Sequence, residues 1–149
     1  MRVYYDPSCL IALYLTEPLS GSMRTFVEKQ NQPVLVNQLQ KLEFRNGLRQ
    51  KVLRREITEQ QLARSLRLFD DDAVAEKVQR KQLIWPAVYA QAEAISRRWA
   101  ADQTCRAFDL LHVAIAVASN VRQFATADSG QAELARTVGL RVTQFGISQ

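Results

Sequence analysis

The stretch Val3–Tyr4–Tyr5–Asp6–Pro7–Ser8–Cys9–Leu10–Ile11 places a short apolar strand directly before a helix, with an acidic residue between them. Pro7 suits the first turn of a helix, where its missing N–H costs nothing. Short apolar strands alternate with longer helical patterns along the rest of the chain. This alternation predicts an α/β fold, in which a mainly parallel sheet is covered by helices on both faces.

The expected elements follow from apolar periodicity and from turn and capping residues. Thr58 and Gln61 have the spacing of a capping box, which predicts the start of a helix. The predicted strands are 3–5, 33–36, 123–126 and 140–143, and the predicted helices are 7–16, 22–29, 38–54, one that begins near 58, 86–101, 107–118 and 131–138.

A chain of 149 residues has the length of one domain, and no linker or repeat interrupts it. We therefore expect a single domain over residues 1–149. Lys and Arg outnumber Asp and Glu by 20 to 15, a net charge of +5. This balance favours a polyanionic partner, although a basic domain without such a partner has the same composition.

Targeting and cysteine patterns indicate a cytoplasmic protein without membrane contact. The apolar run from Cys9 to Leu15 is too short to cross a bilayer, and no convincing signal cleavage site follows it. Cys9 and Cys105 lack metal-finger spacing and are predicted to be buried thiols in a reducing compartment. One disulfide between them is the alternative that the sequence leaves open.

Four acidic residues lie at the ends of predicted elements or within them: Asp6, Glu43, Asp109 and Asp128. Asp6 and Asp128 follow strands, and open α/β sheets bind ligands outside the carboxyl ends of their strands. Carboxylates that converge there repel one another unless a cation lies between them. Hard divalent ions prefer oxygen ligands, so a metal-dependent hydrolase is the first hypothesis.

Each of these acids also has a simpler explanation. Asp6, Asp109 and Asp128 each stand where a helix N-cap would accept a backbone hydrogen bond. Glu43 alone fits an exposed helix residue. Taken together, the four acidic residues favour the functional interpretation, because their order along the chain matches a known pattern.

That pattern consists of four segments, 5–13 (YDPSCLIAL), 42–48 (LEFRNGL), 106–114 (RAFDLLHVA) and 124–131 (FATADSGQ), with Ala135 and Gly139–Leu140 after them. In order and spacing they resemble the motifs of PIN-domain proteins over nearly the whole chain. Length and layout look most like the VapC-type toxins of bacterial toxin–antitoxin pairs. Leu110 departs from the pattern, since a small residue often follows that aspartate.

The resemblance implies a three-layer α/β/α sandwich and a Mg²⁺- or Mn²⁺-dependent endoribonuclease that hydrolyses RNA. It carries over Asp6, Glu43, Asp109 and Asp128 as the catalytic, metal-binding carboxylates. It also implies a cognate antitoxin protein as partner and a homodimer.

Several polar neighbours are candidates for supporting roles. Ser8 and Thr126 are expected to hydrogen-bond a ligating carboxylate or a metal-bound water, with turn and cap roles as the alternative. Asn46 shares a helix face with Glu43, and Arg106 has the spacing to pair with a carboxylate. Basic residues near Glu43 are candidate phosphate contacts, with a solvated helix face as the alternative; they include Arg45 and Arg49.

Other hydrolase chemistries lack the residues that they need. His112 is the only histidine and no G-x-S-x-G segment is present, which argues against a Ser–His–Asp triad. We expect His112 to be a hydrogen-bonded core residue. Two non-enzymatic alternatives stay open: a nucleic-acid-binding domain that keeps the fold, and a subunit that only binds proteins.

Overall fold

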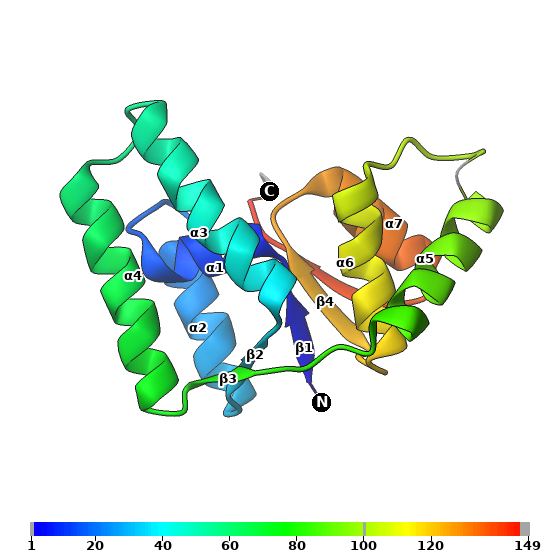
Figure 1. Cartoon of the computed structure of the whole chain (residues 1–149), viewed down its shortest axis with the longest axis horizontal. Helices are drawn as coiled ribbons and strands as arrows, with labels where there is room; N and C mark the ends of the chain where they lie inside the picture. Colours follow the sequence, from blue (N-terminus) through cyan, green and yellow to red (C-terminus); the bar gives the residue numbers. More distant parts are fainter. Residues whose placement is uncertain (1, 100, 147–149) are drawn as a thin grey trace. The chain divides into compact units, whose positions relative to one another are not determined.

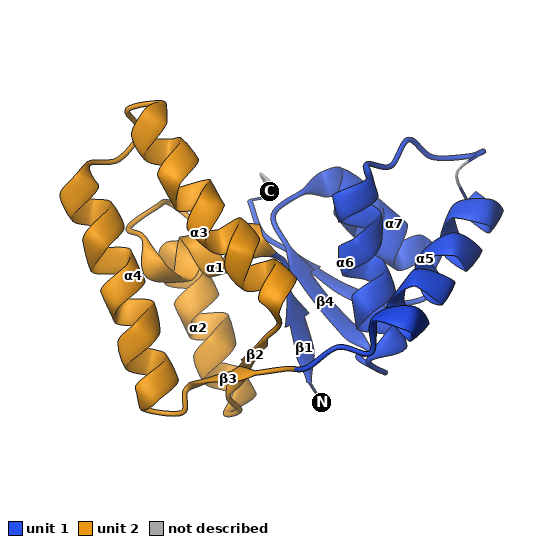
Figure 2. Ribbon diagram, viewed as in Figure 1, with its two compact units in different colours: residues 1–6, 82–149 blue, residues 7–81 orange. Residues whose placement is uncertain are grey.

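The computed structural model describes residues 2–99 and 101–146, which form two compact units (Figure 2). Unit 1 consists of Met1–Asp6 and Gln82–Gln149, and unit 2 of Pro7–Lys81. The chain therefore passes from one unit to the other directly after Asp6 and again after Lys81. The expectation of a single domain stays a prediction.

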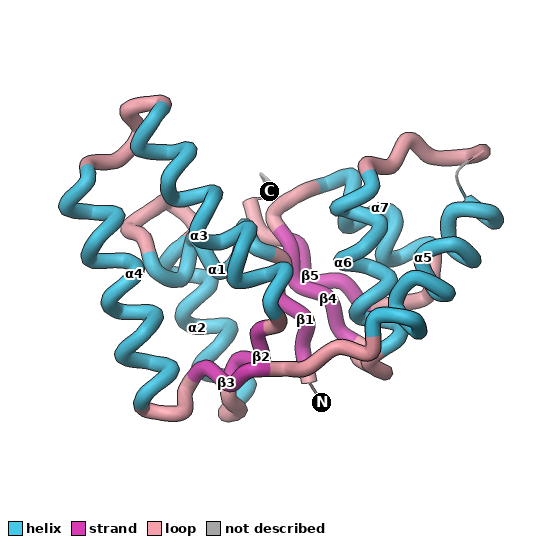
Figure 3. Tube along the Cα trace, viewed as in Figure 1, coloured by secondary structure: helices cyan, strands magenta, loops and turns pink. Residues whose placement is uncertain are grey.

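Unit 1 contains a parallel sheet with the strand order β1-β4-β5, labelled in Figure 3. Tyr5 pairs with Ala125, and the Asp6 N–H continues this ladder by donating to the Ala125 carbonyl at 3.0 Å. The described elements of this unit are β1 (Val3–Tyr5), β4 (Gln123–Thr126), β5 (Arg141–Gln144), α5 (Trp85–Trp99), α6 (Ala107–Ala118) and α7 (Ser129–Thr137).

The interior of unit 1 joins the sheet to these helices. Helix α7 packs against β4 and β5, and α6 contacts both α5 and α7. Tyr4 stacks on Phe124 with ring centroids 5.3 Å apart, and its hydroxyl is hydrogen-bonded to Nδ1 of His112 at 2.6 Å. His112 is 1% exposed, so its predicted role as a hydrogen-bonded core residue is confirmed.

Unit 2 contains a second parallel strand pair and the four helices of the first half of the chain (Figure 1). Helix α1 contacts the other three helices of this unit. The elements are β2 (Val34–Val36), β3 (Val78–Arg80), α1 (Pro7–Tyr14), α2 (Ser20–Gln30), α3 (Gln38–Leu53) and α4 (Glu59–Val74).

Aromatic side chains fill the space between α1, α3 and α4. The rings of Tyr14, Phe44 and Phe69 lie 4.9 to 5.7 Å from one another, in the tilted and edge-on arrangements that aromatic pairs prefer. The Tyr14 hydroxyl donates to Oδ2 of Asp72 at 2.7 Å. A Cβ atom at Gly47 would lie 2.7 Å from Cδ1 of Ile11, so glycine allows α3 to approach α1 closely.

Capping boxes fix the starts of two helices in unit 2. Asn37 and Gln40 exchange side-chain and backbone hydrogen bonds at the start of α3, and Thr58 and Gln61 do so at the start of α4. The predicted Thr58 capping box is therefore confirmed. Strand β3 was not expected from the sequence.

The cysteines differ from the prediction in one respect. Cys9 is buried as expected, but Cys105 is exposed because it lies in the segment between α5 and α6. The structure contains no disulfide between these two cysteines. Among the described residues, no helix has the length and apolar character needed to cross a membrane.

Candidate active site

Three of the four predicted carboxylates belong to unit 1. Asp6 directly follows β1, and Asp128 lies two residues beyond the end of β4. The strands are parallel neighbours, so their carboxyl ends share one edge of the sheet. Asp109 lies in the first turn of α6, and its Oδ1 is 3.5 Å from the side-chain amide of Gln131 on α7.

Thr126, the last residue of β4, connects the two strand ends. Its hydroxyl donates to Oδ2 of Asp6 at 3.0 Å and accepts the backbone N–H of Asp128 at the same distance. Thr126 is fully buried and Asp6 is 7% exposed. A buried carboxylate has lost most of its water, and the hydroxyl replaces part of that lost hydrogen bonding.

Gln131 is the residue on which all three carboxylates converge. Its backbone N–H donates to Oδ1 of Asp128 at 2.7 Å, and its side-chain amide lies 3.5 Å from Oδ1 of Asp109. The other end of the amide lies 3.1 Å from the Thr126 hydroxyl. Gln131 is only 2% exposed, so its contacts are with protein groups.

The orientation of the Gln131 amide follows from counting hydrogens. The Thr126 hydroxyl has a single hydrogen, which it donates to Asp6, and so it cannot also donate to an amide oxygen of Gln131. With the amide nitrogen on this side, Gln131 donates to Thr126 at 3.1 Å and to both carboxylate oxygens of Asp6 at 3.3 Å. We assign this orientation, which gives buried Asp6 two neighbouring donor groups. The amide oxygen of Gln131 then lies 3.5 Å from Oδ1 of Asp109, and these two acceptors form no hydrogen bond with each other.

A helix cap is the alternative role for all three aspartates, and the structure tests it for Asp128 and Asp109. Asp128 is the N-cap of α7 and accepts the Gln131 N–H with Oδ1, while its side chain is exposed. Asp109 is not an N-cap, because α6 begins at Ala107 and Arg106 occupies the cap position. The cap position explains Asp128 in part, but it does not explain Asp109.

The remaining predicted residues are divided between the units. Glu43 is half-buried on α3 of unit 2, and its part in the site stays a prediction. Arg106 is exposed at the start of α6 and forms no ion pair with another described residue. The others belong to helices of unit 2, where their predicted roles stay predictions: Ser8 on α1, and Arg45, Asn46 and Arg49 on α3.

The donor chemistry of this site suits a hard cation. The amide nitrogen of Gln131 donates to Asp6 and its oxygen lies 3.5 Å from Oδ1 of Asp109, so oxygen atoms are the metal ligands that these residues offer. Mg²⁺ commonly uses one or two carboxylates and completes its shell with water and substrate phosphate. Among residues 2–99 and 101–146, no three His, Cys, Asp or Glu side chains are grouped closely enough to hold an ion by themselves.

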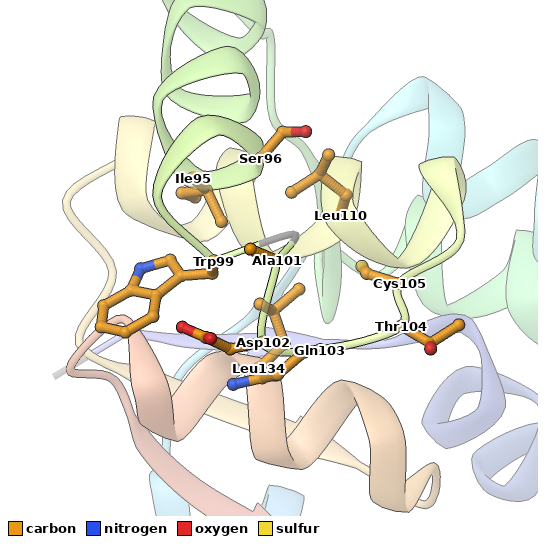
Figure 4. A pocket seen from close by; sticks show the side chains of 10 residues that line it. All are labelled: Ile95, Ser96, Trp99, Ala101, Asp102, Gln103, Thr104, Cys105, Leu110 and Leu134. Atoms are coloured by element: carbon orange, nitrogen blue, oxygen red, sulfur yellow. The ribbon is translucent and has the colours of Figure 1, made fainter.

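A hollow of about 400 Å³ lies in unit 1 between α5, α6, α7 and the segment that follows α5. Figure 4 shows Trp99, Leu110 and Leu134 facing it, with Cys105 in the connecting segment. Partial burial raises the pKa of the Cys105 thiol, and the negative charge of Asp109 raises it further. The electrostatic influence of Asp109 therefore extends to this hollow.

Gln131 is the contact residue that was not singled out from the sequence as a site residue. It stands in the segment Thr126–Ala127–Asp128–Ser129–Gly130–Gln131, five positions after the end of β4. Asp128 caps α7, so Gln131 lies in the first turn of that helix, close to the end of β4. The place of Gln131 in the segment 124–131, one of the four segments that carry the family resemblance, is the sequence signal that could have identified it.

Carboxylates gathered at the carboxyl edge of a parallel sheet define an α/β protein with an acidic site. The family model of the PIN domain matches residues 3–137, and the chain belongs to this family. The predicted fold class, an α/β sandwich of the PIN type with a mainly parallel sheet, is confirmed. Among curated proteins, none matches the chain.

Two solved structures illustrate the likeness. A chain in the crystal structure of VapBC2 from Rickettsia felis, bound to a DNA fragment from its promoter, is 14% identical with a TM-score of 0.68. The similarity covers 97% of this chain and 98% of that one. FitAcB from Neisseria gonorrhoeae is also 14% identical, with a TM-score of 0.59 and coverage of 95% and 96%. At this identity, the likeness shows a shared fold.

Proposed function

We propose that this protein is a Mg²⁺- or Mn²⁺-dependent endoribonuclease that hydrolyses RNA phosphodiester bonds. The observation that supports this most directly is the convergence of Asp6, Asp109 and Asp128 on Gln131. Membership of the PIN domain family supports the same chemistry. A protein that only binds phosphate would gain nothing from carboxylates at the same place.

The residues of the proposed site have different roles in holding the cation. Asp6 and Asp109 would hold the cation, which when bound supplies an activated water and neutralises charge on the phosphate. Thr126 and Gln131 hold Asp6 through hydrogen bonds, so that its carboxylate keeps one orientation. Asp128 and Glu43 complete the proposed site, directly or through water.

The biological setting is part of the proposal. The similar structures contain VapBC2 and FitAcB, and the layout of the chain resembles VapC-type toxins. We infer a toxin of a type II toxin–antitoxin pair, with a cognate antitoxin, a homodimeric state, a cytoplasmic location and both units working as one domain. Co-purification with the product of a small neighbouring reading frame tests the antitoxin.

RNA cleavage with added Mg²⁺ or Mn²⁺ tests the activity. Cleavage should stop in EDTA and fall at least 100-fold in Asp6→Asn and Asp109→Asn. The matched control is Asp71→Asn, which removes one carboxylate from an exposed position of α4. Cleavage that persists in EDTA, or that is equal in all three variants, would refute the proposal.

A further inference from the structure

A second hollow, of about 240 Å³, lies in unit 2 at the carboxyl ends of its two parallel strands. Val36 ends β2, Arg80 ends β3, and α3 begins directly after β2. The hollow is lined by Val36, Asn37, Gln38, Lys41, Arg45, Phe69, Ala73, Val78, Gln79 and Arg80. This edge of a parallel sheet is where α/β proteins bind ligands.

Positive charge dominates the lining. Lys41 and Arg45 come from α3, and Arg80 comes from β3, so two separate elements supply cations to one small space. Arg45 has an acidic neighbour in Asp70 at 3.6 Å. The side chain of Asp70 is 61% exposed, so water screens this pair and leaves Arg45 available to a stronger anion.

The backbone around the hollow is held in place. The Asn37–Gln40 capping box fixes the first turn of α3, with side-chain to backbone distances of 2.8 and 2.9 Å. Val36 is paired with Arg80, and the Lys81 N–H donates to the Val36 carbonyl at 2.9 Å. The Cα positions of the cationic residues are therefore set by α3 and by the strand ladder.

We propose that this hollow binds a phosphate group of the RNA backbone. The inference rests on the proposed ribonuclease function and adds a substrate contact to it. Arginine forks match the geometry of phosphate oxygens, and the side-chain amides of Gln38 and Gln79 provide further donors. The volume is below the roughly 300–1,000 Å³ of pockets that enclose a whole small ligand, so one phosphate and its sugar suit it better.

The test measures binding of a fluorescent, 2′-O-methylated single-stranded RNA by anisotropy, in EDTA, across several salt concentrations. The variant K41Q/R80Q removes one lysine and one arginine from the hollow. The control K29Q/R67Q removes the same two charges from exposed positions on α2 and α4 of the same unit. Both proteins are compared with wild type by circular dichroism and thermal unfolding.

Near 0.1 M salt, the RNA affinity of K41Q/R80Q should be about tenfold lower than that of wild type. The affinity of the control should be less than about twofold lower. The slope of log affinity against log salt should fall by about 0.7 in magnitude, since one phosphate contact with a single strand contributes roughly that amount. The variant R80K keeps the charge and should retain most of the affinity. Equal losses in K41Q/R80Q and in the control would overturn the proposal.

The two hypotheses fail in different ways. RNA binding that depends on Lys41 and Arg80, in a protein that cuts no RNA with Mg²⁺ or Mn²⁺, would support this site and refute the nuclease. Metal-dependent cleavage with unchanged RNA binding in K41Q/R80Q would do the reverse. A labelled polyglutamate peptide that loses binding in K41Q/R80Q, while RNA binding stays normal, would assign the hollow to an acidic protein and overturn the proposal.

Discussion

The hydroxyl of Thr126 donates a hydrogen bond to Oδ2 of Asp6 across 3.0 Å, although 120 positions separate the two residues in the sequence. Parallel pairing of β1 with β4 brings them together, because each residue lies at the carboxyl end of its strand or directly after it. This hydrogen bond holds the Asp6 carboxylate, which is a proposed metal ligand, against the end of β4. The sheet register decides how a candidate metal ligand is oriented.

Removing this donor should destabilise the protein. Thr126→Val keeps the side-chain shape but leaves the buried Asp6 carboxylate with one donor fewer, at an expected cost of about 1–3 kcal/mol. Thr126→Ser retains the hydroxyl and should lose less. Urea unfolding at pH 7 measures the free energy of unfolding for both. Equal stability of the valine and serine variants would contradict the role given to this bond.

Gln131 should matter for activity beyond its contribution to folding. Gln131→Leu has a similar volume but loses the amide that donates to Asp6 and Thr126. We expect metal-dependent cleavage to fall at least tenfold in a protein that still unfolds cooperatively, and the apparent Mn²⁺ affinity to weaken in parallel.

The matched control for Gln131 is Gln50→Leu, the same exchange at an exposed position of α3. Its cleavage rate should equal that of wild type. Electron paramagnetic resonance of Mn²⁺ gives the metal affinity without reference to activity. A Gln131→Leu protein with wild-type affinity and rate would show that the amide serves folding alone.

The sequence established more of the fold than of the site. Strand 123–126 and helix 107–118 agree with β4 and α6, because continuous apolar runs define them locally. Strand β3 was missed because only Val78 of its three residues is buried, and its strand character comes from pairing with β2. Cys105 was wrongly placed inside, since nearby apolar residues do not determine where a connecting segment runs.

The candidate site was also predicted only in part from the sequence. The sequence placed Asp6 and Asp128 after strands, which is where the structure has them. The convergence on Gln131 depends on how α6 and α7 pack beside the sheet, and no local pattern encodes that. Glu43 was placed on the helix that contains it, but a helical period cannot tell which part of the fold its side chain serves.

Tyr14 should make stability depend on alkaline pH. Burial raises the pKa of its hydroxyl above the ordinary value of about 10, and the hydrogen bond to the negatively charged Asp72 raises it further. Above pH 10 the unfolded chain releases this proton while the folded chain keeps it. The contribution is therefore fully present below pH 10 and is lost as the pH rises beyond it.

Tyr14→Phe should remove this contribution. The variant should be less stable at pH 7 by about 1 kcal/mol, because it loses the hydrogen bond to Asp72. Its free energy of unfolding should fall less steeply than that of wild type between pH 10 and 11. Urea titrations at pH 7, 10 and 11 compare the two, and parallel curves would exclude Tyr14 as the titrating group.

Cys105 offers a chemical probe of Asp109. Its thiol is exposed, but its pKa is raised, so alkylation at pH 8 should be slower than for an unperturbed thiol. Asp109→Asn should lower that pKa and speed the reaction several-fold. Iodoacetamide labelling followed by mass spectrometry measures the rate. Asp71→Asn should leave it unchanged, and an equal rate in Asp109→Asn would mean that the carboxylate does not act on the thiol.

The interrupted course of the chain through the two units has a consequence for synthesis. Unit 2 is one continuous segment, whereas the sheet of unit 1 joins the first strand of the chain to strands that follow residue 122. On a ribosome, residues 7–81 emerge in full before β1 meets its partner. The nuclease centre proposed for the edge of that sheet would therefore be completed only after β4 and the start of α7 have emerged, and a shorter nascent chain would be harmless to RNA.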